Sequence, residues 1–115
     1  MADQPLIKDT GSVLEQFFAA MTKKDNAAIL KMFHPSGTVT DLESNTLRAG
    51  QINAFFRDWP PRSMLVKVGR QQITGQSAEV TLNVMGGGFS KPTDAKLSFL
   101  FDEKFLIKSL RIRIG

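Results

Sequence analysis

One histidine and one aspartate hold most of the chemical potential of this sequence. His34 is the only histidine of the 115 residues, and Asp41 follows it closely. An imidazole near a carboxylate can gain and lose a proton between about pH 5 and pH 8, so the pair could act as a general acid and base. The alternative for His34, which precedes Pro35 at a predicted helix end, is contact with the last helix carbonyls or with solvent. The alternative for Asp41 is a structural role in a turn or at a strand end.

Residue types exclude several other kinds of site. The chain has no cysteine, which removes disulfides, thiolate nucleophiles and zinc–thiolate sites, and it has no tyrosine. A typical zinc site needs more than one histidine, so we expect no metal and no cofactor. The Gly86-Gly87-Gly88 run lacks the lysine and hydroxyl residue of a phosphate-binding loop. No serine stands in a motif typical of a catalytic triad.

The charge balance is mildly basic. Fifteen basic and 11 acidic residues give a net charge of +4. This excess suits an acidic partner or RNA, and an RNA-contacting accessory domain is one hypothesis, although so small an excess does not favour nucleic acid. No apolar run is long enough to span a membrane, and Met1 to Ser12 lack the apolar segment of a secretory signal. We therefore expect an intracellular protein.

Helical spacing of apolar residues predicts three helices in the first half of the chain. The first begins at Ser12, which forms a capping box with Glu15. The second covers residues 27–33 and ends before a proline, because proline disfavours helix in the residue that precedes it. The third runs from about residue 49 to residue 58 and ends at Pro60-Pro61, which have no backbone N–H to donate.

Strands dominate the second half of the chain. A short strand is expected at residues 38–41, and alternating apolar residues then predict four strands, at 64–68, 78–84, 95–101 and 110–114. Gly75-Gln76 and Asp102-Glu103-Lys104 have hairpin length, which favours antiparallel neighbours. Gly86-Gly87-Gly88 predicts a bulge or a long hairpin tip. This order indicates a single α+β domain over residues 1–115, with helices on one face of a curved antiparallel sheet.

Several short motifs resemble the nuclear transport factor 2-like family, whose fold is a cone-shaped sheet wrapped around helices. They are Met1-Ala2-Asp3-Gln4-Pro5-Leu6-Ile7, Arg48-Ala49-Gly50-Gln51-Ile52 and Ala54-Phe55-Phe56-Arg57-Asp58-Trp59-Pro60-Pro61-Arg62-Ser63. The last stretch is also similar to the messenger-RNA export cofactor of that family. The resemblance implies a non-enzymatic, dimerising binding module in the nucleocytoplasmic transport of protein or messenger RNA, present in cytoplasm and nucleus.

The resemblance also implies partners and the residues that meet them. The partners would be a second copy of the chain or a related subunit, nuclear pore repeats and a small GTPase. Ile7 takes the position of a tryptophan that binds pore repeats, and the segment from Phe89 to Asp94 matches the loop that meets the GTPase. Trp59 and Phe56 are predicted to grip an apolar side chain at the mouth of the cone. The alternative for both is core packing.

One face of the sheet is predicted to pair two subunits, because the family dimerises sheet to sheet. Its residues are a mixture of polar, charged and aliphatic types, which suits an interface. We expect on this face Leu65, Thr81, Asn83, Leu100, Arg111 and Arg113, together with Glu79, Lys96, Ser98 and Ile107. The alternatives are a solvated face, or arginines that meet acidic residues or RNA phosphate.

Ketosteroid isomerase-like enzymes share this fold and suggest an alternative function. The protein would then bind a small molecule, or act as an isomerase or cyclase, in the cone. The resemblance makes Asp41 the candidate base and His34 an auxiliary group. Such enzymes also use an oxyanion hole that contains a tyrosine, and the matching residue here is Phe17, which has no donor. A cone filled by Phe17, Phe99 and Met85 would exclude this alternative.

Overall fold

The protein is described here by a computed structural model that covers residues 10–48, 50–59, 64–86 and 89–114, with side chains omitted at 89 and 90. The predicted Pro60-Pro61 helix stop, Gly87 and Gly88 lie outside these residues. In chain order the elements are α1 (Thr10–Lys23), α2 (Asn26–Lys31), β1 (Phe33–Thr40), β2 (Thr46–Arg48), α3 (Gly50–Asp58), β3 (Met64–Thr74), β4 (Ser77–Gly86), β5 (Phe89–Phe101) and β6 (Ile107–Ile114). None of the helices in this part of the chain is long and apolar enough to cross a membrane.

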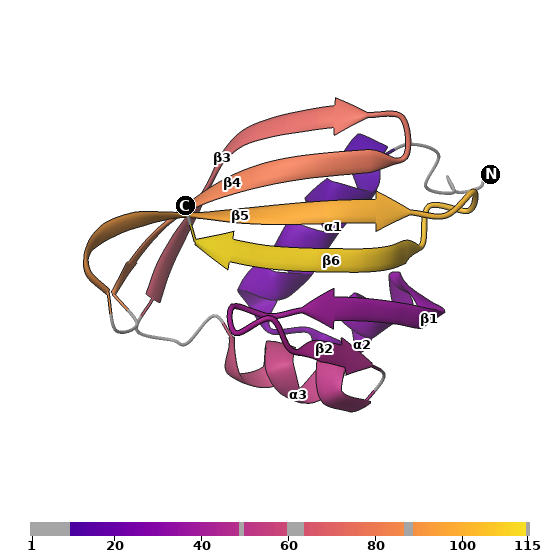
Figure 1. The fold of residues 1–115 in the computed structure, drawn as a ribbon, viewed down its shortest axis with the longest axis horizontal. Helices are drawn as coiled ribbons and strands as arrows, with labels where there is room; N and C mark the ends of the chain where they lie inside the picture. The colour runs from indigo at the N-terminus through magenta and orange to yellow at the C-terminus, as the bar shows by residue number, and fades with distance from the viewer. Residues whose placement is uncertain (1–9, 49, 60–63, 87–88, 115) are drawn as a thin grey trace.

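The strands form one curved sheet in the order β2-β1-β6-β5-β4-β3, and this confirms the predicted α+β fold. Figure 1 shows α1 crossing behind the sheet while α3 lies along the β1–β2 edge. The expectation of a wholly antiparallel sheet is wrong at one pair, since β1 runs parallel to β6. These two strands are joined by most of the chain rather than by a hairpin, so no short turn forces them to be antiparallel.

The boundary between α2 and β1 differs from the prediction. The helix ends at Lys31, and β1 starts at Phe33, where helical periodicity predicted a continuing helix. The backbone N–H of Ile107 donates to the carbonyl of Met32 at 2.7 Å, so pairing with β6 holds this segment in the sheet. The three-residue strand β2 was not expected, because so short a segment has no readable periodicity.

The first helix also begins earlier than predicted. It starts at Thr10, and Ser12 lies within it, so the predicted capping box does not mark its end. The Thr10 hydroxyl donates to the carbonyl of Gly75 at 3.0 Å and joins the start of α1 to the β3–β4 turn. Gly75 has a φ of 57°, which glycine adopts at little cost in a two-residue hairpin turn. The predicted hairpin at Gly75-Gln76 is therefore confirmed.

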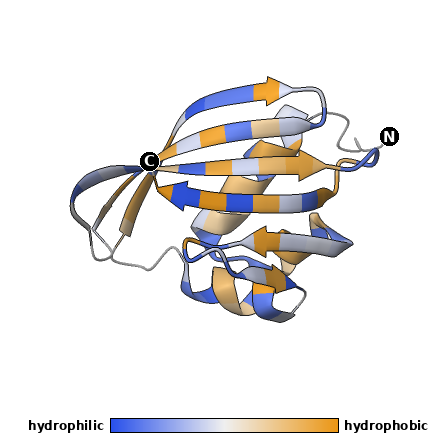
Figure 2. Cartoon of the chain, viewed as in Figure 1, coloured by the Kyte–Doolittle hydropathy of each residue, from blue (hydrophilic) through white to orange (hydrophobic). Residues whose placement is uncertain are grey.

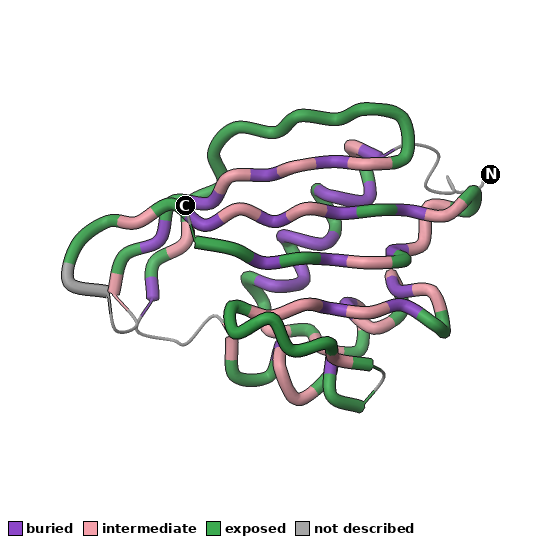
Figure 3. Tube along the Cα trace, in the orientation of Figure 1, coloured by how far each residue is buried: buried purple, intermediate pink, exposed green. Residues whose placement is uncertain are grey.

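Aromatic rings fill the space between α1 and the sheet. The Phe17 side chain is fully buried, and its ring meets those of Phe18, Phe56 and Phe99 edge-on, at centroid distances of 5.4, 5.7 and 5.3 Å. Buried residues alternate with half-buried or exposed ones along β4, β5 and β6 (Figure 3). Phe17 and Phe99 therefore occupy the interior of the cone. Met85 does not, because it is exposed and pairs with Leu65 on the opposite face.

Candidate functional site

A pocket of about 390 Å³ opens between α2, β1 and α3. Its volume falls within the range of about 300–1,000 Å³ that is usual for small-molecule sites. The wall is mainly apolar, with one imidazole and one carboxamide as polar groups. The residues that line it are Leu30, Phe33, His34, Pro35, Gly37, Gly50, Ile52 and Asn53.

A distortion of β1 forms one wall of this pocket. Phe33 pairs with Ile107 and Thr38 pairs with Ser109, so β1 contains more residues than β6 over the same length. The extra residues, 34–37, are called the β1 bulge below. A bulge turns side chains away from the regular alternation of a strand, and bulges are frequent beside functional sites. The bulge is how His34, a strand residue, comes to line the pocket.

The hydrogen bonding of His34 defines what this side chain can offer. Its Nδ1 accepts a hydrogen bond from the backbone N–H of Ser36 at 2.9 Å. A neutral imidazole whose Nδ1 lone pair is engaged carries its proton on Nε2. His34 can therefore present an N–H donor at Nε2.

Close packing of the backbone explains why glycine occupies position 37. A Cβ on Gly37 would lie 2.7 Å from the carbonyl oxygen of Ile107 and 2.9 Å from that of His34. Contacts this short with backbone atoms do not occur, so only glycine fits between the bulge and β6. Gly50, across the pocket, is different, since a Cβ there would meet nothing within 4 Å.

Asn53 supplies the second polar group of the wall. The side-chain amide of Asn26, at the start of α2, donates to the backbone oxygen of Asn53 at 3.2 Å and to its Oδ1 at 3.3 Å. These bonds join α2 to α3 and occupy the acceptor side of the Asn53 carboxamide. Its amide nitrogen stays available as a donor.

Asp41 belongs to a turn and does not line this pocket. It follows the opposite end of β1 from the bulge, and its Oδ1 accepts hydrogen bonds from the N–H groups of Glu43 and Asn45, each at 2.9 Å. The fold therefore does not bring His34 and Asp41 together at the pocket. The role of Asp41 as a base stays a prediction, while its structural role in the turn accounts for both of these hydrogen bonds.

A second turn repeats this arrangement between β5 and β6. The Oδ1 atom of Asp102 accepts from the N–H groups of Lys104 and Leu106, at 2.8 and 2.9 Å. Each turn also has a non-glycine residue with a positive φ, Ser44 at 65° and Phe105 at 62°. The sequence predicted a hairpin at Asp102-Glu103-Lys104 but not this role of the Asp102 side chain, although an aspartate directly after a strand is typical of such a turn.

The environment of Asp102 makes stability depend on pH. Burial raises the pKa of its carboxyl, but the N–H groups of Leu106 and Lys104 outweigh this and lower the pKa overall, together with the charge that His34 carries when protonated and the charge of Lys104. A lowered folded-state pKa stabilises the protein above the unfolded value of about 3.9. That contribution disappears as the pH falls through the folded-state pKa.

We therefore expect Asp102→Asn to lose less stability than the wild type between about pH 5 and pH 2, because the uncharged amide has no proton to take up. Urea unfolding at several pH values measures this difference. Glu103→Gln is the matched control, since it removes a neighbouring carboxylate to which no hydrogen bond is assigned in the described part of the chain. An identical acid dependence in wild type and Asp102→Asn would contradict the lowered pKa.

The residues predicted to contact a partner differ in how far they are buried. Phe56 is 1% exposed and packs on Phe17, so the prediction that it contacts a partner is corrected: its ring belongs to the core. Trp59 is half-buried and stacks on Phe55 with ring centroids 5.6 Å apart. Asp94 is exposed and its Oδ1 accepts from the Asn83 amide at 3.2 Å.

Two further predicted partner contacts have no described side chain. Ile7 lies outside the described residues. Phe89 begins β5, but only its backbone is described. Among the residues whose side chains are placed, no group of three histidine, aspartate or glutamate side chains gathers in a way that could hold a metal ion.

The strand register places the predicted dimer residues on the side of the sheet away from the helices, which is called the outer face below. Residues that are paired across two strands lie on the same face of the sheet. Every second residue of β4, β5 and β6 faces the core, so the residues between them lie on the outer face. The outer face carries Leu65, Thr81, Asn83, Leu100, Arg111 and Arg113, together with Glu79, Lys96 and Ser98. Ile107 is the exception and corrects the prediction, because it is fully buried.

These features define a nuclear transport factor 2-like fold, and solved structures of that class superimpose on the chain. No protein-family model and no curated protein matches the sequence. A steroid delta-isomerase from Pseudomonas aeruginosa has a TM-score of 0.80 and 13% identity, covering 98% of this chain and 84% of its own. A putative polyketide cyclase from Sinorhizobium meliloti has a TM-score of 0.71 and 22% identity, covering 88% and 93%.

A third similar structure is a nuclear transport factor 2-like protein of unknown function from Cytophaga hutchinsonii. Its TM-score is 0.74 at 13% identity, and the match covers 99% of this chain and 95% of that one. Identities this low establish the fold and nothing finer. The similar structures are mostly isomerases, cyclases or proteins of unknown function rather than transport factors.

Proposed function

We propose that the protein binds a small, largely apolar molecule in the pocket between α2, β1 and α3. The observation that carries this proposal is the pocket itself, whose size and mainly apolar wall suit such a ligand. The names of two similar structures, a steroid delta-isomerase and a putative polyketide cyclase, favour a small-molecule ligand over a role in nuclear transport.

The two polar groups of the wall suggest what the ligand carries. His34 offers an N–H at Nε2, and Asn53 offers its side-chain amide. Both groups are donors, so we infer a ligand with a carbonyl, ether or hydroxyl oxygen as acceptor. If the bound ligand also reacts, His34 is the group placed to exchange a proton with it. Asp41 has no part in this proposal because the turn holds it away from the pocket.

Filling the pocket tests the proposal. A leucine at position 50 has room for its Cβ and would extend into the space beside the bulge, so Gly50→Leu should weaken binding of the dye 8-anilinonaphthalene-1-sulfonate by at least about tenfold. Fluorescence titration gives the affinity, and amide shifts of Leu30 and Ile52 locate the dye. Gly50→Ala is the control that leaves the pocket open. Equal affinity in both variants, or shifts elsewhere, would reject this site.

A second candidate function is the binding of a protein partner on the outer face. Large aliphatic side chains are exposed there beside charged ones, with Leu65 71%, Met85 44% and Leu100 43% exposed. The partner predicted from the sequence is a second copy or a related subunit, and this stays a proposal. Nuclear pore repeats and a small GTPase, which the resemblance assigns to Ile7 and to the segment from Phe89 to Asp94, stay predictions.

A further inference from the structure

Positive charge accumulates on the outer face. The strand register places cationic side chains at outward positions of four of the six strands, β2, β3, β5 and β6. Carboxylates occupy fewer of the outward positions. The cations are Arg48, Lys67, Lys96, Arg111 and Arg113, and the carboxylates are Glu79 and Asp94. Figure 2, which views this face, shows hydrophilic residues alternating with hydrophobic ones along β6.

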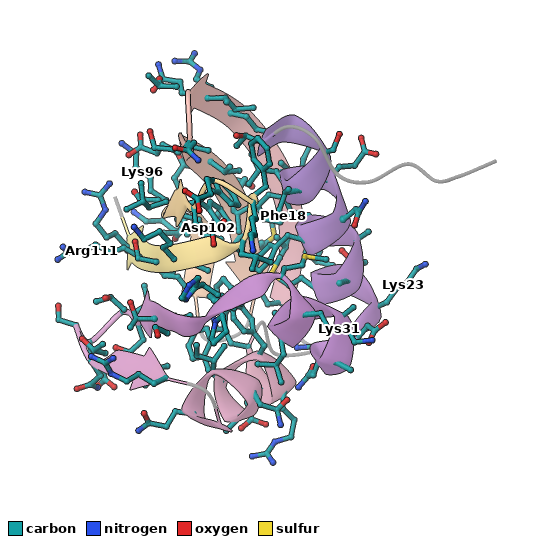
Figure 4. The ribbon with its side chains drawn as sticks, turned by 90° about the vertical axis from the view of Figure 1, so that its right-hand side faces the viewer. Phe18, Lys23, Lys31, Lys96, Asp102 and Arg111 are labelled. Atoms are coloured by element: carbon teal, nitrogen blue, oxygen red, sulfur yellow. The ribbon has the colours of Figure 1, made fainter. Side chains whose placement is uncertain are left out.

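Among the described residues, one of these cations forms an ion pair with a carboxylate. Arg113 Nη2 lies 3.0 Å from Glu79 Oε2. Lys96 stands directly opposite Arg113, and Arg111 stands opposite Ser98, so like charges are neighbours across the strands. Within the described residues, neither Lys96 nor Arg111 makes an ion pair or a side-chain hydrogen bond. Figure 4 shows both side chains projecting from the sheet side, opposite Lys23 and Lys31 on the helix side.

This distribution opposes pairing of the face with itself. A two-fold interface brings the same surface patch together from both subunits, so an excess of cations on one copy meets the same excess on the other. Like charges brought together at an interface lose their hydration without gaining an attraction, whereas carboxylates placed opposite would gain both ion pairs and hydrogen bonds. The face is therefore better suited to an acidic surface than to a second copy.

We propose that the outer face docks a protein partner whose facing surface is rich in carboxylates, in place of a second copy of this chain. The inference rests on the partner-binding role proposed above. A protein fits better than a nucleic acid for two reasons. Leu65, Leu100 and Met85 are exposed among the cations and need apolar contacts to cover them. The described part of this face also has no aromatic side chain on which a base could stack.

A charge-reversed copy of the chain provides an acidic partner of known shape. The variant Arg48→Glu/Lys67→Glu/Lys96→Glu/Arg111→Glu keeps the Arg113–Glu79 pair and makes the face strongly acidic. In sedimentation at about 50 µM, we expect the wild type and the variant each to behave as a single chain of 12.7 kDa, and an equal mixture to form a pair. The pair should dissociate when ionic strength rises from about 0.02 M to 0.5 M.

Two controls keep this test specific. The variant Lys23→Glu/Lys31→Glu/Arg57→Glu/Lys104→Glu carries the same change in charge on other parts of the surface, and it should not pair with the wild type. Circular dichroism checks that both variants are folded. Leu65→Ser/Leu100→Ser in the wild-type chain should weaken the mixed pair at least about tenfold, because a protein partner also needs the apolar contacts.

Each remaining outcome would overturn the proposal in a distinguishable way. A wild-type chain that pairs with itself, and loses this pairing on Arg111→Glu, would leave the partner-binding role standing with a second copy as occupant. A mixture that stays monomeric would reject both the acidic partner and the partner-binding role. A uridine oligonucleotide that binds more tightly than the reversed copy, with no effect of Leu65→Ser/Leu100→Ser, would assign the face to nucleic acid instead.

Discussion

Phe17→Ala should lower the free energy of unfolding by about 3–5 kcal/mol, the largest loss we expect from one substitution in this protein. The Phe17 side chain is fully buried and contacts three other phenylalanine rings, so its removal leaves a cavity that rigid neighbours cannot fill. Urea denaturation followed by circular dichroism measures the loss. A change below about 1 kcal/mol would contradict a tightly packed cone.

Two further variants of Phe17 separate packing from polarity. Phe17→Leu keeps most of the apolar volume and should cost clearly less than alanine. Phe17→Tyr adds the hydroxyl that a ketosteroid isomerase-like site would use, in a place surrounded by aromatic rings. A buried hydroxyl without a partner costs about 1–3 kcal/mol, so we expect Phe17→Tyr to destabilise the protein. A neutral or stabilising effect would reveal a polar partner inside the cone.

Gly37→Ala should destabilise the protein by about 2–3 kcal/mol, although it adds only one methyl group. The new Cβ would meet two backbone oxygens, those of Ile107 and His34, and backbone cannot move aside as a flexible side chain does. Either β1 separates from β6 or the bulge changes shape. Thermal unfolding measures the loss, and amide shifts around His34 report the change in the pocket wall.

The same substitution at Gly50 is the control for Gly37→Ala. Its Cβ would meet nothing within 4 Å, and position 50 begins α3, where alanine is a better helix former than glycine. Gly50→Ala should therefore leave stability unchanged or raise it by up to about 1 kcal/mol. Similar losses at both glycines would show that the loss of glycine itself, and not crowding against β6, causes the effect.

The packing around Phe17 and the pocket wall at Gly37 together indicate that a ligand would bind outside the cone. The ketosteroid isomerase-like alternative needs an open cone, and Phe17 and Phe99 occupy that space. The pocket beside the β1 bulge lies between different elements, where His34 and Asn53 are the polar groups. A ligand-binding role and a filled cone are therefore compatible in this chain.

The candidate site was predictable only in part. His34 was predicted as a candidate site residue because it is the sole histidine, and it lines the pocket. The sequence did not identify Asn53 or Gly37 as site residues. An asparagine on the surface of a helix and a glycine after a serine are both common. Their importance comes from neighbours distant in the chain, Asn26 for Asn53 and Ile107 for Gly37.

The amino-acid sequence by itself determined most of the element types and most of the core. Period-two and helical spacings depend only on which local conformation buries a continuous apolar face, so they predict β3 to β6, the core face of α1 and the α+β class. Pairing of β1 with β6, the bulge and the pocket were decided by tertiary structure alone. They depend on backbone hydrogen bonds and close contacts between segments far apart in the chain, which leave no periodic pattern in either segment.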